Sequence, residues 1–91
     1  MENNWTTIID ETELMKSRIV SFKGYYHRYD LIIFQSDRFK GKQLVVDLQS
    51  NRFSLLDQVT LEEEALLEHD LNYTEVEADD LRRFLRSHFS S

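Results

Sequence analysis

The side chains that could do chemistry in this sequence are few and scattered. Its three histidines, His27, His69 and His88, lie in three different expected elements, and no two have the spacing of metal ligands. Glu68 and Asp70 flank His69, but adjacent residues at the end of a helix point in different directions. The sequence has no cysteine, which excludes disulfides, thiolate nucleophiles and cysteine-ligated metals. We therefore expect no bound metal ion and no cofactor.

Other catalytic arrangements are also missing. The one Gly-Lys pair continues into glutamine, as Gly41-Lys42-Gln43, where a phosphate-binding loop needs Ser or Thr. No Ser or Thr has a base at a recognisable spacing, which nucleophilic catalysis would require. An enzyme acting on a small ligand would have to use Asp37, Arg38 and Gln49 as its polar groups, and nothing in the sequence shows that they converge. We expect a protein that is not an enzyme.

Aromatic and basic side chains alternate from Phe22 to Tyr29 and again from Arg38 to Lys40. Such side chains can fill the ends of a small core, anchor a protein partner, or stack on single-stranded bases and hold phosphates. The net charge of −6 opposes nucleic acid. We therefore predict a protein partner, which could be a second copy of this chain, and keep single-stranded nucleic acid as the alternative. The candidate interaction surface consists of Tyr25, Tyr26, Arg28, Asp37, Arg38, Phe39, Lys40, Lys42, Asn51 and Arg52.

The charge is distributed unevenly along the chain. From Asp57 to Asp80 there are acidic residues but no Lys or Arg, whereas the segment from Lys16 to Arg52 is rich in Lys and Arg. This pattern is typical of a solvated acidic helical region beside a mildly basic sheet. It would also suit a two-sided surface that steers a charged partner.

The elements that would hold these side chains centre on residues 29–56. Three short apolar runs, Leu31–Phe34, Leu44–Val46 and Phe53–Leu56, are separated by polar segments that can turn. Gly41 and Asn51 lie in those segments and tolerate a positive φ. With a further strand at residues 18–22, the pattern predicts an antiparallel β-meander of about four strands over residues 17–56.

Alternation within each expected strand assigns side chains to the two faces of the sheet. Tyr29, Leu31 and Ile33 share one face of their strand, and Ile32 and Phe34 share the other. We expect one nearly continuous apolar face, covered by helices, and one mixed face that is partly wet.

The period of the apolar pattern becomes helical after residue 56. Capping boxes at Thr60–Glu63 and Thr74–Glu77 predict the starts of two helices within a helical segment at residues 60–89. The first helix should end near His69. The second has a helical stripe that should pack on the apolar sheet face. That stripe consists of Val76, Ala78, Leu81, Phe84, Leu85 and Phe89 or His88.

The whole pattern predicts an α+β fold in a single domain at residues 1–91, with one or two C-terminal helices packed on one face of the sheet. Residues 1–16 should form an N-terminal arm or an edge strand, which would be a fifth strand. The apolar runs are too short to span a membrane. The start of the chain has no basic segment followed by an apolar one, so we expect a cytoplasmic protein.

Four segments resemble a known family. They are Arg18–Phe22, Arg28–Leu31, Ser36–Lys42 and Asp47–Phe53. Together they look like a small uncharacterised family of Firmicutes, domain of unknown function 3055, in which a glycine more often stands in the turn at Asn51. The resemblance implies a cytosolic bacterial protein and brings no activity, cofactor or catalytic residue.

Overall fold

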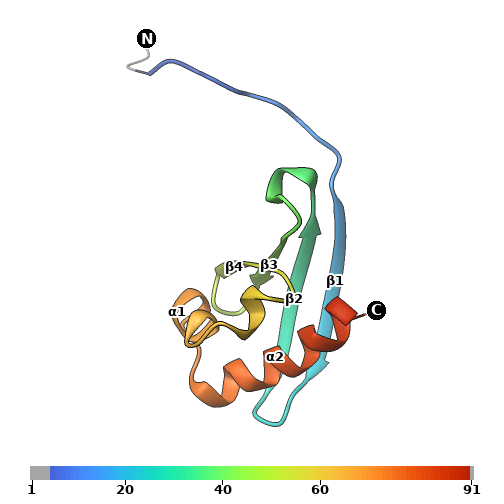
Figure 1. Cartoon of the computed structure of the whole chain (residues 1–91), viewed down its shortest axis with the longest axis vertical. Coiled ribbons are helices and arrows are strands. Elements are labelled where there is room, and N and C mark those ends of the chain that lie inside the picture. Colours follow the sequence, from blue (N-terminus) through green and yellow to red (C-terminus); the bar gives the residue numbers. More distant parts are fainter. Residues whose placement is uncertain (1–4, 91) are drawn as a thin grey trace.

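The computed structural model describes residues 5–90 and confirms the predicted α+β fold. Four antiparallel strands pair in the order β1-β2-β3-β4, and two helices follow the sheet in the chain (Figure 1). The strands are β1 (Lys16–Lys23), β2 (Arg28–Gln35), β3 (Gln43–Asp47) and β4 (Arg52–Leu56). The helices are α1 (Leu66–Leu71) and α2 (Glu75–Ser90), and short 3₁₀ turns occupy η1 (Asp37–Phe39) and η2 (Thr60–Glu62).

The two turn residues singled out in the sequence adopt the expected backbone. Gly41 has φ of 86° in the β2–β3 loop, and Asn51 has φ of 59° in the β3–β4 turn. Both values lie in the left-handed region, which glycine enters without steric cost and asparagine tolerates well. These two residues let the chain reverse direction between neighbouring strands, so the meander forms as predicted.

The hydrophobic core lies between one face of the sheet and the two helices. Tyr29, Leu31 and Ile33 of β2 point into it, as their alternation predicted. They meet apolar side chains from both helices and from η2, all of which are fully buried. The helical side of this core consists of Leu61, Leu67, Leu71, Ala78, Leu81 and Leu85.

The register of the other strands places polar side chains on the covered face. Ile33 of β2 lies opposite Val45 of β3, and Val45 lies opposite Ser54 of β4. The covered face therefore includes two polar residues, Asp47 and Ser54, each only 2% exposed. The expectation of one apolar and one mixed face is wrong, because alternation within a strand does not say which of its two sides faces the core.

Both buried polar residues have partners from the helical segment. The hydroxyl of Tyr73 donates to the Asp47 carboxylate, which also accepts the amide of Gln49 at 2.8 Å. The Ser54 hydroxyl donates to Asp70 Oδ2 at 2.7 Å. A buried polar group is tolerated when it is hydrogen-bonded, so these bonds orient α1 and the start of α2 on the sheet.

The predicted first helix at Thr60–His69 is wrong, because η2 and α1 divide it. The Thr60 hydroxyl donates to Asp57 Oδ1 at 3.0 Å and accepts the Asp57 amide at 2.9 Å, so it does not cap Glu63. Ala65 then adopts φ of 62°, which interrupts the helix. This break lets Leu61 and Leu67 both reach the core, although their separation of six residues does not match a helical repeat.

The predicted C-terminal helix is confirmed as α2. The Glu77 amide donates to Thr74 Oγ1 at 3.3 Å, and Glu77 Oε1 accepts the Thr74 amide at 2.9 Å, which completes the capping box. Most of its predicted stripe packs against the core. Val76 is the exception, because its side chain is about half exposed.

Residues 5–15 form an arm that belongs to no strand and projects beyond the body of the domain (Figure 1). The described residues therefore form four strands and no fifth, and residues 1–4 of the predicted segment lie outside the described residues. Within the described part of the chain, no helix has both the length and the apolar character needed to cross a membrane.

A buried carboxylate fastens the β1–β2 hairpin to α2. Asp80 Oδ1 accepts the Tyr25 amide at 3.0 Å and an Arg83 guanidinium nitrogen at 2.7 Å. Its Oδ2 accepts the Tyr26 amide at 3.0 Å and the Tyr29 hydroxyl at 2.8 Å. Burial alone would raise the pKa of Asp80, but these donors outweigh it and lower the pKa to about 2. We call this group the Asp80 clamp.

Glycine at position 24 lets the hairpin approach the clamp. A Cβ atom there would overlap the Asp80 carboxylate and lie 2.8 Å from Cε2 of Tyr29. Gly24 therefore serves close packing of the hairpin against α2, which only a residue without a side chain allows.

The Asp80 clamp predicts a specific loss of stability. Replacing Asp80→Asn removes the buried negative charge beside Arg83 and should lower the free energy of unfolding by about 2–4 kcal/mol at pH 7. Because the folded pKa of Asp80 is depressed, its contribution is present above about pH 4 and is lost as the pH falls toward 2. The difference in the free energy of unfolding between wild type and Asp80→Asn, measured by urea denaturation, should therefore become smaller at acid pH.

The matched control is Asp79→Asn, one residue away on α2. The Asp79 side chain is 59% exposed and pairs only with Arg82, so its loss should cost under about 1 kcal/mol. Equal effects of the two substitutions would contradict the clamp.

Candidate functional site

The residues predicted to form one contact surface lie at opposite ends of the sheet. Asp37, Arg38, Phe39, Lys40 and Lys42 occupy the β2–β3 loop. The turn with Asn51 and Arg52 joins β3 to β4 at the other end, beside the hairpin that carries Tyr25, Tyr26 and Arg28. The structure therefore groups the ten residues into two sets and does not bring the sets together.

The polar groups considered for a small-ligand enzyme are also apart. Asp37 and Arg38 belong to the β2–β3 loop, where Arg38 binds the arm through Glu13 at 2.7 Å. Gln49 lies at the far end of β3 and donates to Asp30 Oδ2 at 3.1 Å. The three side chains do not converge on one place where a substrate could bind.

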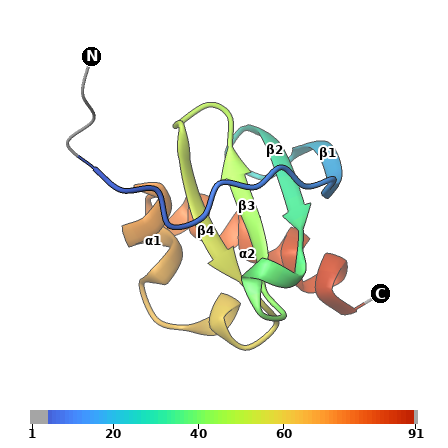
Figure 2. The ribbon, with the colours of Figure 1, turned by 90° about the horizontal axis from the view of Figure 1, so that it is seen from above.

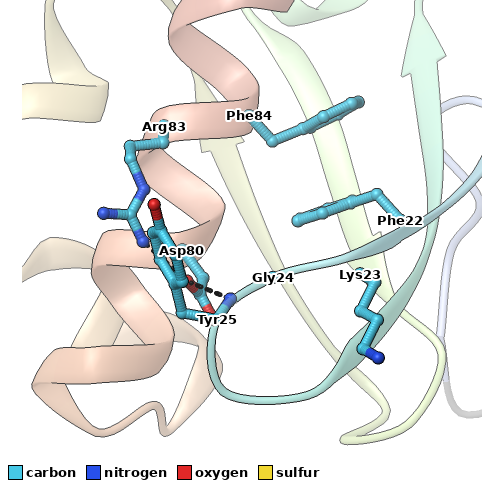
Figure 3. A pocket seen from close by; sticks show the side chains of 7 residues that line it. All are labelled: Phe22, Lys23, Gly24, Tyr25, Asp80, Arg83 and Phe84. Carbon is cyan, nitrogen blue, oxygen red and sulfur yellow. Dashed lines mark hydrogen bonds and ion pairs between the residues drawn. The ribbon is translucent and has the colours of Figure 1, made fainter.

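The tip of the β1–β2 hairpin forms a shallow hollow with α2 (Figure 3). The hollow has a volume of about 400 Å³, and the rings of Phe22 and Phe84 stack at its apolar side with centroids 4.4 Å apart. The Arg83 guanidinium lies 4.5 Å from the centre of the Tyr25 ring. Figure 3 shows the two side chains beside each other at the hairpin tip. Because Arg83 also pairs with Asp80, its charge is already engaged within the protein.

The second large feature is the sheet face turned away from the helices. Two rows of apolar side chains cross it, and none of these side chains is buried. The first row crosses all four strands and the second joins β2, β3 and β4. We call this surface the open sheet face, made by Ile19, Ile32, Val46 and Phe53 in the first row and Phe34, Leu44 and Leu55 in the second.

Exposure of the open sheet face is greatest at the two edge strands. Ile19 on β1 is 78% exposed and Phe53 on β4 is 61% exposed, while Ile32 and Val46 between them are half-buried. Figure 2 shows the four strands side by side with the helices toward one side of the sheet. Large contiguous apolar patches are uncommon on monomeric soluble proteins and mark contact surfaces.

A polar cluster bounds the open sheet face at its hairpin end. Asp30 accepts the Ser21 hydroxyl at 2.5 Å, Arg28 Nε at 3.1 Å and Gln49 Nε2 at 3.1 Å. These bonds, the one from Ser21 first, lower the pKa of Asp30 below its usual value. An apolar centre with a hydrogen-bonded rim is the common anatomy of a protein–protein contact.

The open sheet face is not evident as a site from the sequence alone. Of the ten predicted contact residues, Arg28 belongs to the polar cluster at its rim. The alternation of side chains in β2 does predict that Ile32 and Phe34 lie on the side opposite Leu31. What the sequence could not show was that Val46 and Phe53 continue the same face across the sheet, since that depends on the pairing register.

His27 at the hairpin tip predicts a pH dependence of stability. Its Nε2 lies 2.7 Å from Glu77 Oε2 and its Nδ1 lies 2.7 Å from the Arg28 carbonyl oxygen. Both partners only accept hydrogen bonds, so the doubly protonated ring fits best, and the bond to Glu77 raises the pKa of His27.

The contribution of His27 to the free energy of unfolding should therefore be complete below about pH 6.5. It should be lost as the pH rises through the raised pKa that His27 has in the folded protein. We expect the thermal midpoint of the wild type to fall relative to that of His27→Gln between about pH 6 and 9. The control is His69→Gln, which replaces an exposed histidine and should retain the wild-type profile. A difference between wild type and His27→Gln that does not change with pH would rule out the ion pair.

Comparison with known proteins places this geometry in a family. The chain matches the model of a family described as SAV0927-like over residues 8–87, a range that includes the whole sheet, α1 and most of α2. No curated protein matches the chain. Since the family model covers the open sheet face, the Asp80 clamp and most of the arm, this chain belongs to the SAV0927-like family.

Proposed function

We propose that this protein is a non-enzymatic protein-interaction or regulatory domain, and that the open sheet face is its contact surface. The observation that carries this proposal is the pair of apolar rows that cross the sheet without a covering element. Covering an exposed Ile or Phe side chain completely is worth about 1.5–3 kcal/mol. A partner that covers the most exposed members, Ile19 and Phe53, would therefore gain substantial binding free energy.

The chemistry of the open sheet face favours a protein partner with an apolar surface. The face is built from aliphatic and aromatic side chains, and its charged groups lie at the rim, where Arg28 pairs with Asp30. The partner we propose is a second copy of this chain, since a closed assembly of identical chains lets equivalent surfaces cover one another.

A role in binding single-stranded nucleic acid has less support from this geometry. Such a site needs cations that follow the phosphates beside aromatic rings. Phe34 and Phe53 are aromatic, but their neighbours in the two rows are aliphatic and carry no charge. A catalytic role also has less support, because the polar groups considered for it lie apart.

The resemblance of the sequence segments supports two finer statements. We infer that the protein corresponds to the Firmicutes family catalogued as domain of unknown function 3055, and that it acts in the bacterial cytoplasm. The four segments that carry this resemblance all lie within residues 8–87, which match the SAV0927-like model.

The contact surface predicts the effect of a double substitution. Ile19→Ser with Phe53→Ser removes one exposed side chain from each edge of the open sheet face. Because both side chains are largely exposed, the free energy of unfolding of the monomer should change by under about 1 kcal/mol. Self-association, measured by light scattering over a range of protein concentrations, should weaken at least about tenfold.

The matched control is Val59→Ser with Val76→Ser. These valines are 76% and 51% exposed and lie outside the strands, so this variant should associate as the wild type does. Pull-downs from lysate with both variants test for other protein partners. A wild type that stays monomeric and captures no partner, or captures the same partners as the open-face variant, would overturn the proposal.

A further inference from the structure

The arm is the second uncovered apolar element of the chain. Trp5 is 70% exposed, Ile8 92% and Ile9 65%, and no described part of the domain covers them. Residues 5–15 lie outside every strand and helix, and the arm extends from the start of β1 away from the body of the domain (Figure 1). The long dimension of the molecule, 52 Å against 28 and 24 Å, reflects this projection.

The root of the arm is fastened to the β2–β3 loop. Arg38 Nε donates to Glu13 Oε2 at 2.7 Å, and the other end of the guanidinium pairs with Glu11. The Ser36 hydroxyl donates to Glu13 Oε1 at 2.7 Å. These contacts hold residues 11–13 at the loop, so the apolar residues before them are directed away from their own sheet.

We propose that the arm of one copy of this chain covers the open sheet face of a second copy, and that the exchange is reciprocal. This inference rests on the proposed function, because it uses the same surface, and it names the segment that occupies it. Trp5 and Ile9, which share one side of an extended arm, would be the contacting side chains. Arg38 would act as a positioning residue that sets the direction of the arm.

The dimensions of the two elements agree. An extended segment from Trp5 to Ile9 is about 13 Å long at about 3.3 Å per residue. The row from Ile19 to Phe53 crosses four strands and spans about 14 Å at about 4.8 Å between neighbours. Because side chains alternate along an extended segment, Trp5 and Ile9 point the same way and can lie near opposite edges of the open sheet face, whereas Ile8 points away from it.

The anchored root favours a second copy over the chain's own sheet. To cover its own face, the arm would have to reverse direction close to Asp10, immediately before the segment that Arg38 holds. In a second copy the arm reaches the face without losing these bonds. The family model begins at residue 8, so most of the arm is part of the domain that the family shares.

Two defective variants of the full chain test the exchange by mixing. The arm variant carries Trp5→Ser and Ile9→Ser, and the face variant carries Ile19→Ser and Phe53→Ser. Each alone lacks one half of every arm–face contact, so each should associate at least about tenfold more weakly than the wild type. A mixture retains one complete contact, from the arm of the face variant to the face of the arm variant, and should form a heterodimer more tightly than either variant associates alone.

The fluorescence of Trp5, the one tryptophan in the sequence, reports the contact directly. In the mixture it is present only in the face variant, and its emission should shift to shorter wavelength as the arm variant is added. Adding the same amount of further face variant instead should leave the wavelength of the emission maximum unchanged. Arg38→Ala in the wild type should weaken association while leaving the thermal midpoint of the dilute monomer nearly unchanged.

The possible outcomes separate this inference from the proposed function. If the face variant fails to associate and mixing it with the arm variant does not restore association, the open sheet face is the contact surface and the arm is not its occupant. If Trp5 is buried in a monomer at every concentration, the arm covers its own sheet and exchange is wrong. If the face variant associates as the wild type does, the proposed contact surface itself is wrong.

Discussion

A four-stranded sheet has two faces, and the two helices of this chain cover only one of them. Helix α2 is long enough to cross the sheet, but α1 has six residues and fills the space beside β4. No described element remains for the second face. Because the helices cover one face only, they bury Leu31 and Val45 on that face. The apolar rows of the open sheet face remain in contact with water. The proposed function rests on this uncovered apolar surface.

Buried polar groups determine how the helices sit on the sheet. Hydrophobic contact alone is not directional, and it would tolerate several placements of α2. The Asp80 clamp connects α2 to the hairpin, and Asp47 and Ser54 connect the sheet to Tyr73 and Asp70. Each of these groups would be costly to bury without its partner, so the correct placement is the one that satisfies all of them.

The arm and the open sheet face have the same physical character and lie apart in the described chain. Both are apolar and both are uncovered, yet the contacts of Arg38 with Glu11 and Glu13 direct the arm outward. Membership of the SAV0927-like family assigns no function to either feature.

The sequence by itself determined the meander, its two tight turns and the C-terminal helix. These features depend on neighbouring residues: Gly41 and Asn51 reverse the chain, and the Thr74–Glu77 capping box begins α2. The predicted first helix failed because of a local contact, and tertiary structure decided two other features. The Thr60 hydroxyl donates to Asp57 and so does not cap the predicted first helix. The β2–β3 pairing places Val45, and not Val46, in the core. The three strand pairings together connect Ile19 to Phe53 through Ile32 and Val46 on the open sheet face. Local spacing does not contain this register, because it depends on contacts between different strands.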